Sequence, residues 1–248
     1  MPKAKHVVVT GGGRGIGAAT ARRFKDLGYR VTLMARTRGE IEPLADEIGA
    51  YSVRVDVGDP ASVEAAFMAA GPVDVLVNNA GMIRPSLVTK TDVRVWEEHL
   101  KVNLTGAFLC SLKVLPGMLG RNWGRIINIC STSSHRGAPY MAAYASSKAG
   151  LLGFTRSLAV EVGDQGVTVN AVTLGYTDSP LVEMAVQGIA EKYEHETVEG
   201  LHKAWEARSP QGRAVPVDEI AKSITELATD EAGSMNGQEV VLDGSDPA

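Results

Sequence analysis

Short runs rich in β-branched residues alternate with helix-like segments along nearly the whole chain, and this alternation limits the folds that the chain can adopt. The predicted strands are residues 6–10, 30–35, 52–55, 73–77, 125–130, 168–173 and 239–242. The predicted helical segments are residues 15–27, 38–48, 61–69, 91–119, 143–162 and 218–228. Apolar strands joined by helices run parallel, because each crossover returns the chain to the same end of the sheet. The pattern therefore predicts an α/β fold: a doubly wound, seven-stranded parallel sheet with helices on both faces.

One long segment, between Thr173 and Val217, carries no predicted strand but two predicted helices, residues 180–189 and 191–207. It follows the carboxyl end of a strand, where open α/β sheets bind ligands. We therefore expect residues 176–212 to form a helical lid over a substrate cleft, with a decorative insertion as the alternative. No linker, repeat or low-complexity stretch interrupts the chain, so we expect a single domain over residues 1–248.

A glycine-rich turn joins the first predicted strand to the helix after it. The turn reads Thr10-Gly11-Gly12-Gly13-Arg14-Gly15-Ile16-Gly17, a G-x-x-x-G-x-G spacing. Glycines at a helix N-terminus let backbone N–H groups and the helix dipole approach a pyrophosphate closely. We therefore predict a dinucleotide site, with an ordinary loop as the alternative. Its predicted residues are Gly11, Gly13, Arg14, Gly15, Ile16 and Gly17.

The end of the second predicted strand indicates which dinucleotide binds. An acidic side chain there would hold the ribose 2′-hydroxyl, whereas a cation would hold a 2′-phosphate. The strand ends in Met34-Ala35-Arg36 without a carboxylate, and Arg38 follows closely. Arg14 in the glycine turn can reach the same region. A forked guanidinium binds phosphate well, so the sequence predicts NADP(H), unless these are arginines of a solvated turn.

Tyr144 and Lys148 lie four residues apart on a predicted helix, with Ser131 thirteen residues upstream. Residues four apart share a helix face, so the phenol and the ammonium can point at one spot. A phenol has a reference pKa of about 10, and a neighbouring cation would lower that pKa toward neutrality. Such a phenol could exchange a proton with an alcohol or carbonyl oxygen. The spacing alone also suits a core tyrosine beside a solvated lysine.

Composition and charge argue against several classes. The 248 residues carry a net charge of −4 and no Lys/Arg block, which argues against a nucleic-acid partner. Cys110 and Cys130 lie in apolar runs without metal-ligand spacing, so we expect buried free thiols and no metal site. We expect no membrane-spanning run, since no apolar stretch looks long enough. Residues 1–6 lead into a strand without a signal-peptide core, so we expect a cytoplasmic protein.

Several motifs together resemble the classical short-chain dehydrogenase/reductases. They are residues 10–17, Asn78-Asn79-Ala80-Gly81, Asn103, Ser131, Tyr144 and Lys148, and the similarity covers essentially the whole chain. Within the family the chain is most similar to the 3-oxoacyl-[acyl-carrier-protein] reductase type. The resemblance implies a Rossmann fold and hydride transfer between NADP(H) and a carbonyl compound or secondary alcohol.

The resemblance also implies roles for the matching residues. Tyr144 is the expected general acid/base, and Lys148 is expected to lower its pKa and to bind the nicotinamide ribose. Ser131 is expected to donate a hydrogen bond to the substrate oxygen. Asn103 is expected to hold a water that links Lys148 to solvent in a proton relay.

Further positions match the cofactor contacts of the family. Asp56 and Val57, after the third strand, match the position that contacts the adenine. Asn79 is expected to line the cofactor cleft, while Asn78 is expected to tie adjacent strands.

The turn after the sixth strand departs from the family pattern. Thr177 and Ser179 are assigned to the cofactor, and Ser179 stands where the family usually has a threonine that meets the nicotinamide carboxamide. Leu174 replaces the usual proline, which predicts a less rigid turn.

The substrate is less constrained than the chemistry. Residues expected near the site are Ser133, His135, Arg136, Tyr140, Met141, Ile83 and Arg84, with Leu181, Met184, Ile189, Tyr193 and Trp205 from the lid. We interpret His135 as a rim residue. Arg121 and Arg125 offer some positive charge for an acidic carrier protein, although Glu161 and Asp164 do not.

The sequence thus predicts an NADP(H)-dependent oxidoreductase that acts on a small ketone, a hydroxy compound or a 3-oxoacyl thioester. A non-catalytic NADP(H)-binding regulatory protein on the same fold is the alternative. The resemblance further implies a homotetramer or homodimer, because the predicted helices at residues 91–119 and 143–162 carry more apolar surface than one sheet face needs.

Overall fold

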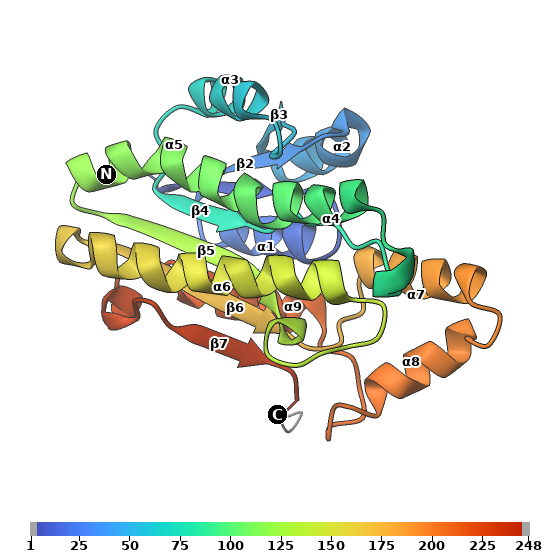
Figure 1. Cartoon of the computed structure of the whole chain (residues 1–248). Coiled ribbons are helices and arrows are strands. Elements are labelled where there is room, and N and C mark those ends of the chain that lie inside the picture. Colours follow the sequence, from blue (N-terminus) through green and yellow to red (C-terminus); the bar gives the residue numbers. More distant parts are fainter. Residues whose placement is uncertain (1–3, 245–248) are drawn as a thin grey trace.

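The structure is a computed structural model that describes residues 4–244; the ends of the predicted domain, residues 1–3 and 245–248, lie outside the described residues. The described chain forms one seven-stranded parallel sheet in the order β3-β2-β1-β4-β5-β6-β7 (Figure 1). The strands are β1 (His6–Thr10), β2 (Arg30–Ala35), β3 (Tyr51–Arg54), β4 (Val75–Asn78), β5 (Gly124–Ser131), β6 (Val167–Leu174) and β7 (Glu239–Leu242). The predicted doubly wound parallel sheet is therefore confirmed.

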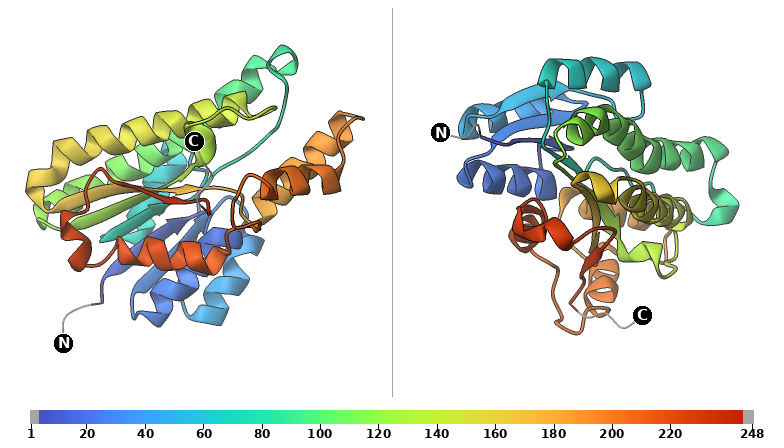
Figure 2. Two further views of the ribbon diagram at one scale, coloured as in Figure 1. Left: turned by 90° about the horizontal axis from the view of Figure 1, so that it is seen from below. Right: turned by 90° about the vertical axis from the view of Figure 1, so that its left-hand side faces the viewer.

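Helices cover both faces of this sheet, as the left view of Figure 2 shows. The α-helices are α1 (Gly15–Asp26), α2 (Arg38–Ile48), α3 (Pro60–Ala70), α4 (Val93–Leu100), α5 (Gly106–Gly120), α6 (Ala142–Val162), α7 (Pro180–Lys192), α8 (Val198–Glu206) and α9 (Val217–Glu226). Short helical turns are η1 (Val88–Lys90), η3 (Thr132–Ser134), η4 (Gly163–Gln165) and η5 (Glu231–Ser234). Buried residues of α1, α2 and α9 pack on one face, and those of α3, α5 and α6 pack on the other.

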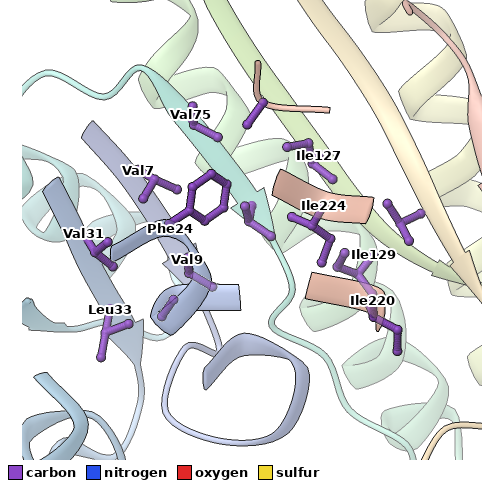
Figure 3. Packing of buried hydrophobic residues seen from close by; sticks show 14 of the residues in the cluster. Val7, Val9, Phe24, Val31, Leu33, Val75, Ile127, Ile129, Ile220 and Ile224 are labelled. Carbon is purple, nitrogen blue, oxygen red and sulfur yellow. The ribbon is translucent and has the colours of Figure 1, made fainter. Parts of the chain in front are cut away.

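Alternation along the strands divides the core between the two faces. Val7 and Val9 of β1 point to the face that carries α1 and α9, while Val8 points to the opposite face. Figure 3 shows Phe24 of α1 between the valines of β1 and β4. All these side chains are fully buried, which is why the middle of β1 is a run of three valines rather than an apolar–polar alternation.

The strand order reverses direction between β1 and β4. The chain leaves β1 toward β2 and β3 on one side, and it continues from β4 to β5, β6 and β7 on the other. Such a switch point leaves a crevice beyond the carboxyl ends of the strands. The glycine turn after Thr10 and the Asn78-Asn79-Ala80-Gly81 turn both begin at this point.

The lid segment differs from its prediction in one helix. The second helix was expected over residues 191–207, but α7 continues to Lys192 and α8 begins only at Val198. The Thr197 side chain caps α8 by accepting a hydrogen bond from the Gly200 N–H at 3.0 Å. Both helices lie beyond the arrowheads of the central strands in Figure 1, at the carboxyl edge of the sheet.

The predicted helix at residues 91–119 is continuous but irregular. Between α4 and α5, residues Lys101–Thr105 form a π-helical segment, η2. The helix Val93–Gly120 is long and apolar enough to cross a membrane by length and composition, contrary to our expectation from the sequence. A core helix passes the same test, and residues such as Cys110, Val114 and Met118 of α5 pack against the sheet.

Candidate active site

Two adjoining cavities lie at the carboxyl ends of the strands. We name them by their landmarks: the tyrosine cavity contains Ser131, Tyr144 and Lys148, and the glycine-turn cavity contains Gly11, Gly15 and Arg36. Residues that line both are Ile16, Asn79, Gly81, Ser179 and Leu181. A ligand can therefore extend from one cavity into the other along the sheet edge.

The glycine turn uses its glycines in two ways. Gly11 and Gly15 line the glycine-turn cavity with positive φ angles of 62° and 52°, which favour glycine. Gly13 and Gly17 face protein instead. A Cβ on Gly17 would lie 2.2 Å from the Gly11 carbonyl oxygen, and one on Gly13 would lie 2.5 Å from the Glu40 carbonyl oxygen. These two predicted cofactor residues thus let backbone segments pack closely and hold the turn in shape.

Two arginines line the far end of the glycine-turn cavity, as the sequence predicted. Arg36 follows β2, and Arg14 precedes α1; both side chains are exposed. Glu40, in the first turn of α2, lines the same cavity. The residue at the tip of β2 does not indicate this carboxylate. The signal for Glu40 is its place in the first turn of the helix that follows β2.

The other predicted cofactor residues near the glycine-turn cavity also lie at the carboxyl ends of the strands. Asp56 and Val57 line the glycine-turn cavity, and the Asp56 carboxylate accepts a hydrogen bond from the Gly58 N–H at 3.0 Å. Asn79 donates from its side-chain amide to the Thr10 and Gly11 carbonyl oxygens, each at 3.0 Å, and so ties the two turns together. Asn78 instead donates to Asn128 of β5 at 2.8 Å, which confirms its predicted role between strands.

Tyr144 and Ser131 approach each other from different elements. Ser131 ends β5, and Tyr144 lies in the first turn of α6. Burial raises the pKa of the Tyr144 phenol to about 12, although its hydrogen bond with Ser131 acts to lower that pKa. A phenol in this setting is protonated at neutral pH.

Lys148 lies one helical turn below Tyr144 and is buried. Its ammonium donates to the Ile129 carbonyl oxygen at 2.7 Å and lies 5.8 Å from the centre of the Tyr144 ring. Burial lowers the pKa of Lys148. The expected lowering of the Tyr144 pKa by Lys148 is not found in this structure, because the amine is directed to a strand carbonyl rather than to the phenol.

Asn103 is buried in the π-helical segment η2. Its amide oxygen accepts from the Met82 N–H at 2.8 Å, and its amide nitrogen donates to the Met82 carbonyl oxygen at 3.1 Å and to Ser147 at 2.9 Å. The Ser147 hydroxyl in turn donates to the Tyr144 carbonyl oxygen at 2.7 Å. Asn103 thus connects the turn after β4 with the helix of Tyr144. π-bulges often occur at functional sites, and the sequence pattern did not reveal this one.

The turn after β6 closes the tyrosine cavity from the lid side. Thr177 and Ser179 both line it, and Ser179 also caps α7 by accepting a hydrogen bond from the Val182 N–H. Leu174, which stands in place of the usual proline, extends β6 and pairs with Leu242 of β7. The Gly175 N–H donates to the Leu242 carbonyl oxygen at 2.9 Å, so the ladder holds this turn without the proline ring.

The wall of the tyrosine cavity is mostly apolar. Expected residues that line it are Ile83, Ser133, Arg136, Met141, Leu181 and Trp205. His135 instead hydrogen-bonds Glu239, Tyr140 bonds Glu196, and Ile189 and Tyr193 pack inside the lid. Lining residues that the sequence did not reveal include Ala138, Tyr176, Val182, Arg208, Ser209 and Asp243. No motif marks these residues, because only the tertiary fold brings them to the cavity.

Arg121 and Arg125 do not lie near the cleft, which corrects our expectation. Arg125 is the second residue of β5 and pairs with Val75 at the start of β4, so it lies at the amino edge of the sheet. Arg121 forms an ion pair with Asp74 at 3.2 Å at the same edge. Among residues 4–244, no group of three or more His, Cys, Asp or Glu side chains could hold a metal ion.

Comparisons with known proteins agree with this geometry. A putative ketoacyl reductase of the monensin polyketide synthase from Streptomyces virginiae is 38% identical over 242 residues, which cover 93% of this chain and 92% of that protein. Acetoacetyl-CoA reductase from Shinella zoogloeoides is 37% identical, with 96% of each chain covered. The 3-oxoacyl-[acyl-carrier-protein] reductase FabG of Escherichia coli is 33% identical over 97% of this chain and 96% of its own.

A solved structure gives the same result. A variant of actinorhodin polyketide ketoreductase with NADPH superposes with a TM-score of 0.88 at 34% identity, covering 98% of this chain and 97% of that one. The family model described as short chain dehydrogenase matches residues 5–190, about three quarters of the chain. The chain therefore belongs to the short-chain dehydrogenases and is an oxidoreductase of that family.

Proposed function

We propose that the protein is an NADP(H)-dependent oxidoreductase that interconverts a carbonyl compound and a secondary alcohol, with Tyr144 as the general acid/base. The observation that carries this proposal is that Ser131, Tyr144 and the buried Lys148 line one cavity, which adjoins the glycine-turn cavity and shares lining residues with it. Relatives named as ketoacyl and acetoacetyl-CoA reductases support the same reaction class.

The residues of the glycine-turn cavity fit a dinucleotide phosphate. Gly11 and Gly15 line the cavity with positive φ angles that favour glycine, and the N-terminus of α1 favours a pyrophosphate. Arg14 and Arg36 can neutralise a 2′-phosphate, which favours NADP(H) over NAD(H). When bound, the nicotinamide supplies the hydride.

The phenol of Tyr144 would provide the proton. Because burial raises its pKa to about 12, Tyr144 keeps its proton at neutral pH and can donate it to the oxygen that becomes a hydroxyl. Ser131 would donate a second hydrogen bond to that oxygen and orient it. Lys148 would bind the nicotinamide ribose, and Asn103 would hold the Tyr144 helix in place through Ser147.

The proposed substrate is a small ketone, a hydroxy compound or a 3-oxoacyl thioester. Helices α7 and α8 would act as a lid over it, within one domain that spans the chain. The apolar wall of the tyrosine cavity supports a substrate with an apolar body. We further propose a cytoplasmic enzyme. NADPH oxidation with an acetoacetyl thioester and with a panel of small ketones separates the substrate classes.

Replacing the phenol tests the mechanism. We expect Tyr144→Phe to lower kcat by about a hundredfold or more, because it removes the proton donor, while NADPH binding remains unchanged. Stopped-flow turnover and a fluorescence titration with NADPH measure the two quantities. Tyr29→Phe is the matched control, because its hydroxyl donates to the Ala228 carbonyl oxygen and Tyr29 is not among the residues that line the tyrosine cavity. A Tyr144→Phe enzyme with the wild-type rate would contradict the mechanism. NADPH binding without turnover of any compound by the wild type would favour the non-catalytic alternative.

A further inference from the structure

Arg208 is a cation of the tyrosine cavity that the proposed reaction does not use. It follows α8 and lines the cavity together with Tyr144 and Ser131. Within residues 4–244, no acidic side chain lies within ion-pair distance of Arg208. Two other exposed arginines do have such partners: Arg213 pairs with Glu219, and Arg84 pairs with Glu98. Arg208 therefore brings an uncompensated positive charge to the cavity.

The other charges that face the cavity do not cancel this one. Arg136 and Asp243 both line the cavity and pair with each other, with 3.4 Å between Nη2 and Oδ2. Among the lining residues that the structure describes, Asp243 is the single acidic side chain, and Arg136 is one of its partners. Lys148 is the remaining lining cation, and it belongs to the reacting end beside Tyr144. Within the described chain, Arg208 is thus the lining cation at the lid end that is engaged neither by an ion pair nor by the reacting end. Burial raises the pKa of Tyr176, and so do the carboxylates on that side, which are those of Glu206, Asp178 and Glu183.

Ser209 adds an unpaired hydrogen-bonding group beside Arg208. The residue is 8% exposed, lines the cavity, and has a buried hydroxyl without a hydrogen-bond partner in the described chain. Gly244 packs over this hydroxyl, since a Cβ there would lie 2.2 Å from Oγ, so the chain's own backbone closes this end. Buried polar groups without partners are rare in folded proteins, and this one lies beside the exposed Arg208 in the sequence.

An apolar wall lies along the rest of the same cavity. It is formed by Ile83, Ala138, Met141, Leu181, Val182 and Trp205. A ligand that fills this space presents its reacting oxygen to Tyr144, an apolar body to the wall, and an acceptor to Arg208. A planar carboxylate suits the forked guanidinium best, because it accepts two parallel hydrogen bonds.

We propose that the substrate is an oxo acid, or the matching hydroxy acid, whose carboxylate is separate from the reacting carbonyl and is held by Arg208. This inference rests on the proposed function, and it selects one class among the substrates that function allows. The neutral ketones and esters of the same length lack the group that pairs with Arg208.

Paired substrates test this inference. The probes are straight-chain oxo acids of increasing length and the methyl ester of each, with NADPH as reductant. We expect the wild type to prefer the best acid over its ester. Arg208→Gln should lower kcat/KM for that acid about tenfold or more and leave the ester unchanged, as expected for loss of a charge-assisted hydrogen bond. Arg208→Lys should retain part of the preference, because it keeps the positive charge but not the forked guanidinium. Lys203→Gln, on exposed α8 surface outside the cavity, is the matched control.

A binding measurement separates this inference from the proposed function. Saturated carboxylates of the same lengths cannot be reduced, and their binding in the presence of NADP⁺ is measured by calorimetry. If Arg208→Gln loses that binding but keeps the wild-type melting temperature, the inference is supported even when no compound is turned over. The absence of turnover would count against the proposed function alone. An unchanged acid-to-ester ratio in Arg208→Gln, a wild type that prefers esters, or equal carboxylate binding by both proteins would overturn it.

Discussion

Tyr144 shows at the level of one residue how burial and a neighbouring charge compete. The spacing to Lys148 predicts a lowered phenol pKa, yet burial dominates and raises that pKa to about 12. The amine is engaged by the Ile129 carbonyl oxygen, at a position that no helical spacing reveals. In this structure the phenol is therefore better suited to donate a proton than to accept one.

Arg36 carries the prediction about cofactor choice. We expect Arg36→Ala to weaken NADPH binding about tenfold and NADH binding much less, because only NADPH offers a 2′-phosphate to the guanidinium. Glu40→Gln is the informative counterpart, since it removes the negative charge from the same cavity and should favour NADPH further. Fluorescence titrations with both nucleotides measure the affinities. Equal losses for NADPH and NADH in Arg36→Ala would show that another residue reads the phosphate.

At the level of elements, the helix Val93–Gly120 organises the site through its irregular middle. The π-helical segment η2 directs Asn103 toward Met82 and Ser147. One turn earlier, His99 of α4 is fully buried, and its Nε2 accepts a hydrogen bond from the Arg84 N–H at 3.1 Å. The helix thus anchors the segment after β4 that lines the tyrosine cavity.

His99 leads to a prediction for the pH dependence of stability. Burial lowers the pKa of His99, so the unfolded chain takes up this proton at about pH 6.5, whereas the folded protein takes it up only at lower pH. The contribution of His99 is therefore fully present above about pH 6.5. It is lost as the pH falls, by up to about 1.4 kcal/mol per pH unit. Urea unfolding at pH values roughly one unit apart, from about pH 7.5 to about pH 5, measures the free energy of unfolding and its pH dependence.

The variant His99→Gln removes the titrating group and is the comparison for that measurement. Its free energy of unfolding should fall less steeply with decreasing pH than that of the wild type. His195→Gln is the control, because that imidazole is exposed. Parallel pH profiles for His99→Gln and the wild type would contradict the assignment.

At the level of the whole molecule, the outer face of the α5 and α6 layer retains exposed apolar side chains. Phe108 and Leu112 of α5 are 45% and 47% exposed, and Val160 of α6 is 85% exposed. Phe108 also packs edge-on against Phe154 of α6, so apolar groups of the two helices meet. Exposed apolar patches often mark a protein–protein interface. We propose that these helices mediate self-association into a homotetramer or homodimer, as the family resemblance implies.

Sedimentation equilibrium tests this assembly. We expect the wild type to sediment as a dimer or tetramer, and the double variant Phe108→Glu, Leu112→Glu to shift to smaller species, because charges on an apolar interface must be desolvated. Met68→Glu on α3 is the control, since Met68 is 75% exposed on a different helix. A wild-type monomer, or an unchanged mass of the double variant, would contradict the proposal.

The sequence by itself determined the class of fold and the order of the functional motifs along the chain. Strand and helix periodicities are local, so the seven strands, α1 and α6 could be predicted with small errors at their ends. The glycine turn, Arg36, Ser131 and Tyr144 could be placed together because carboxyl ends of parallel strands meet at one edge. The break at Thr197 and the π-helical segment depend on contacts and caps that periodicity does not show.

Only the tertiary structure decided the rest of the site. Arg208 and Ser209 reach the tyrosine cavity from the segment after α8, far from Tyr144 in the chain, and no spacing links them to Tyr144. The direction of the Tyr144 pKa shift was likewise decided by burial. The physical reason is common to both: spacing reports which residues share a local face, whereas charge, burial and hydrogen-bond partners depend on elements that pack together from distant positions.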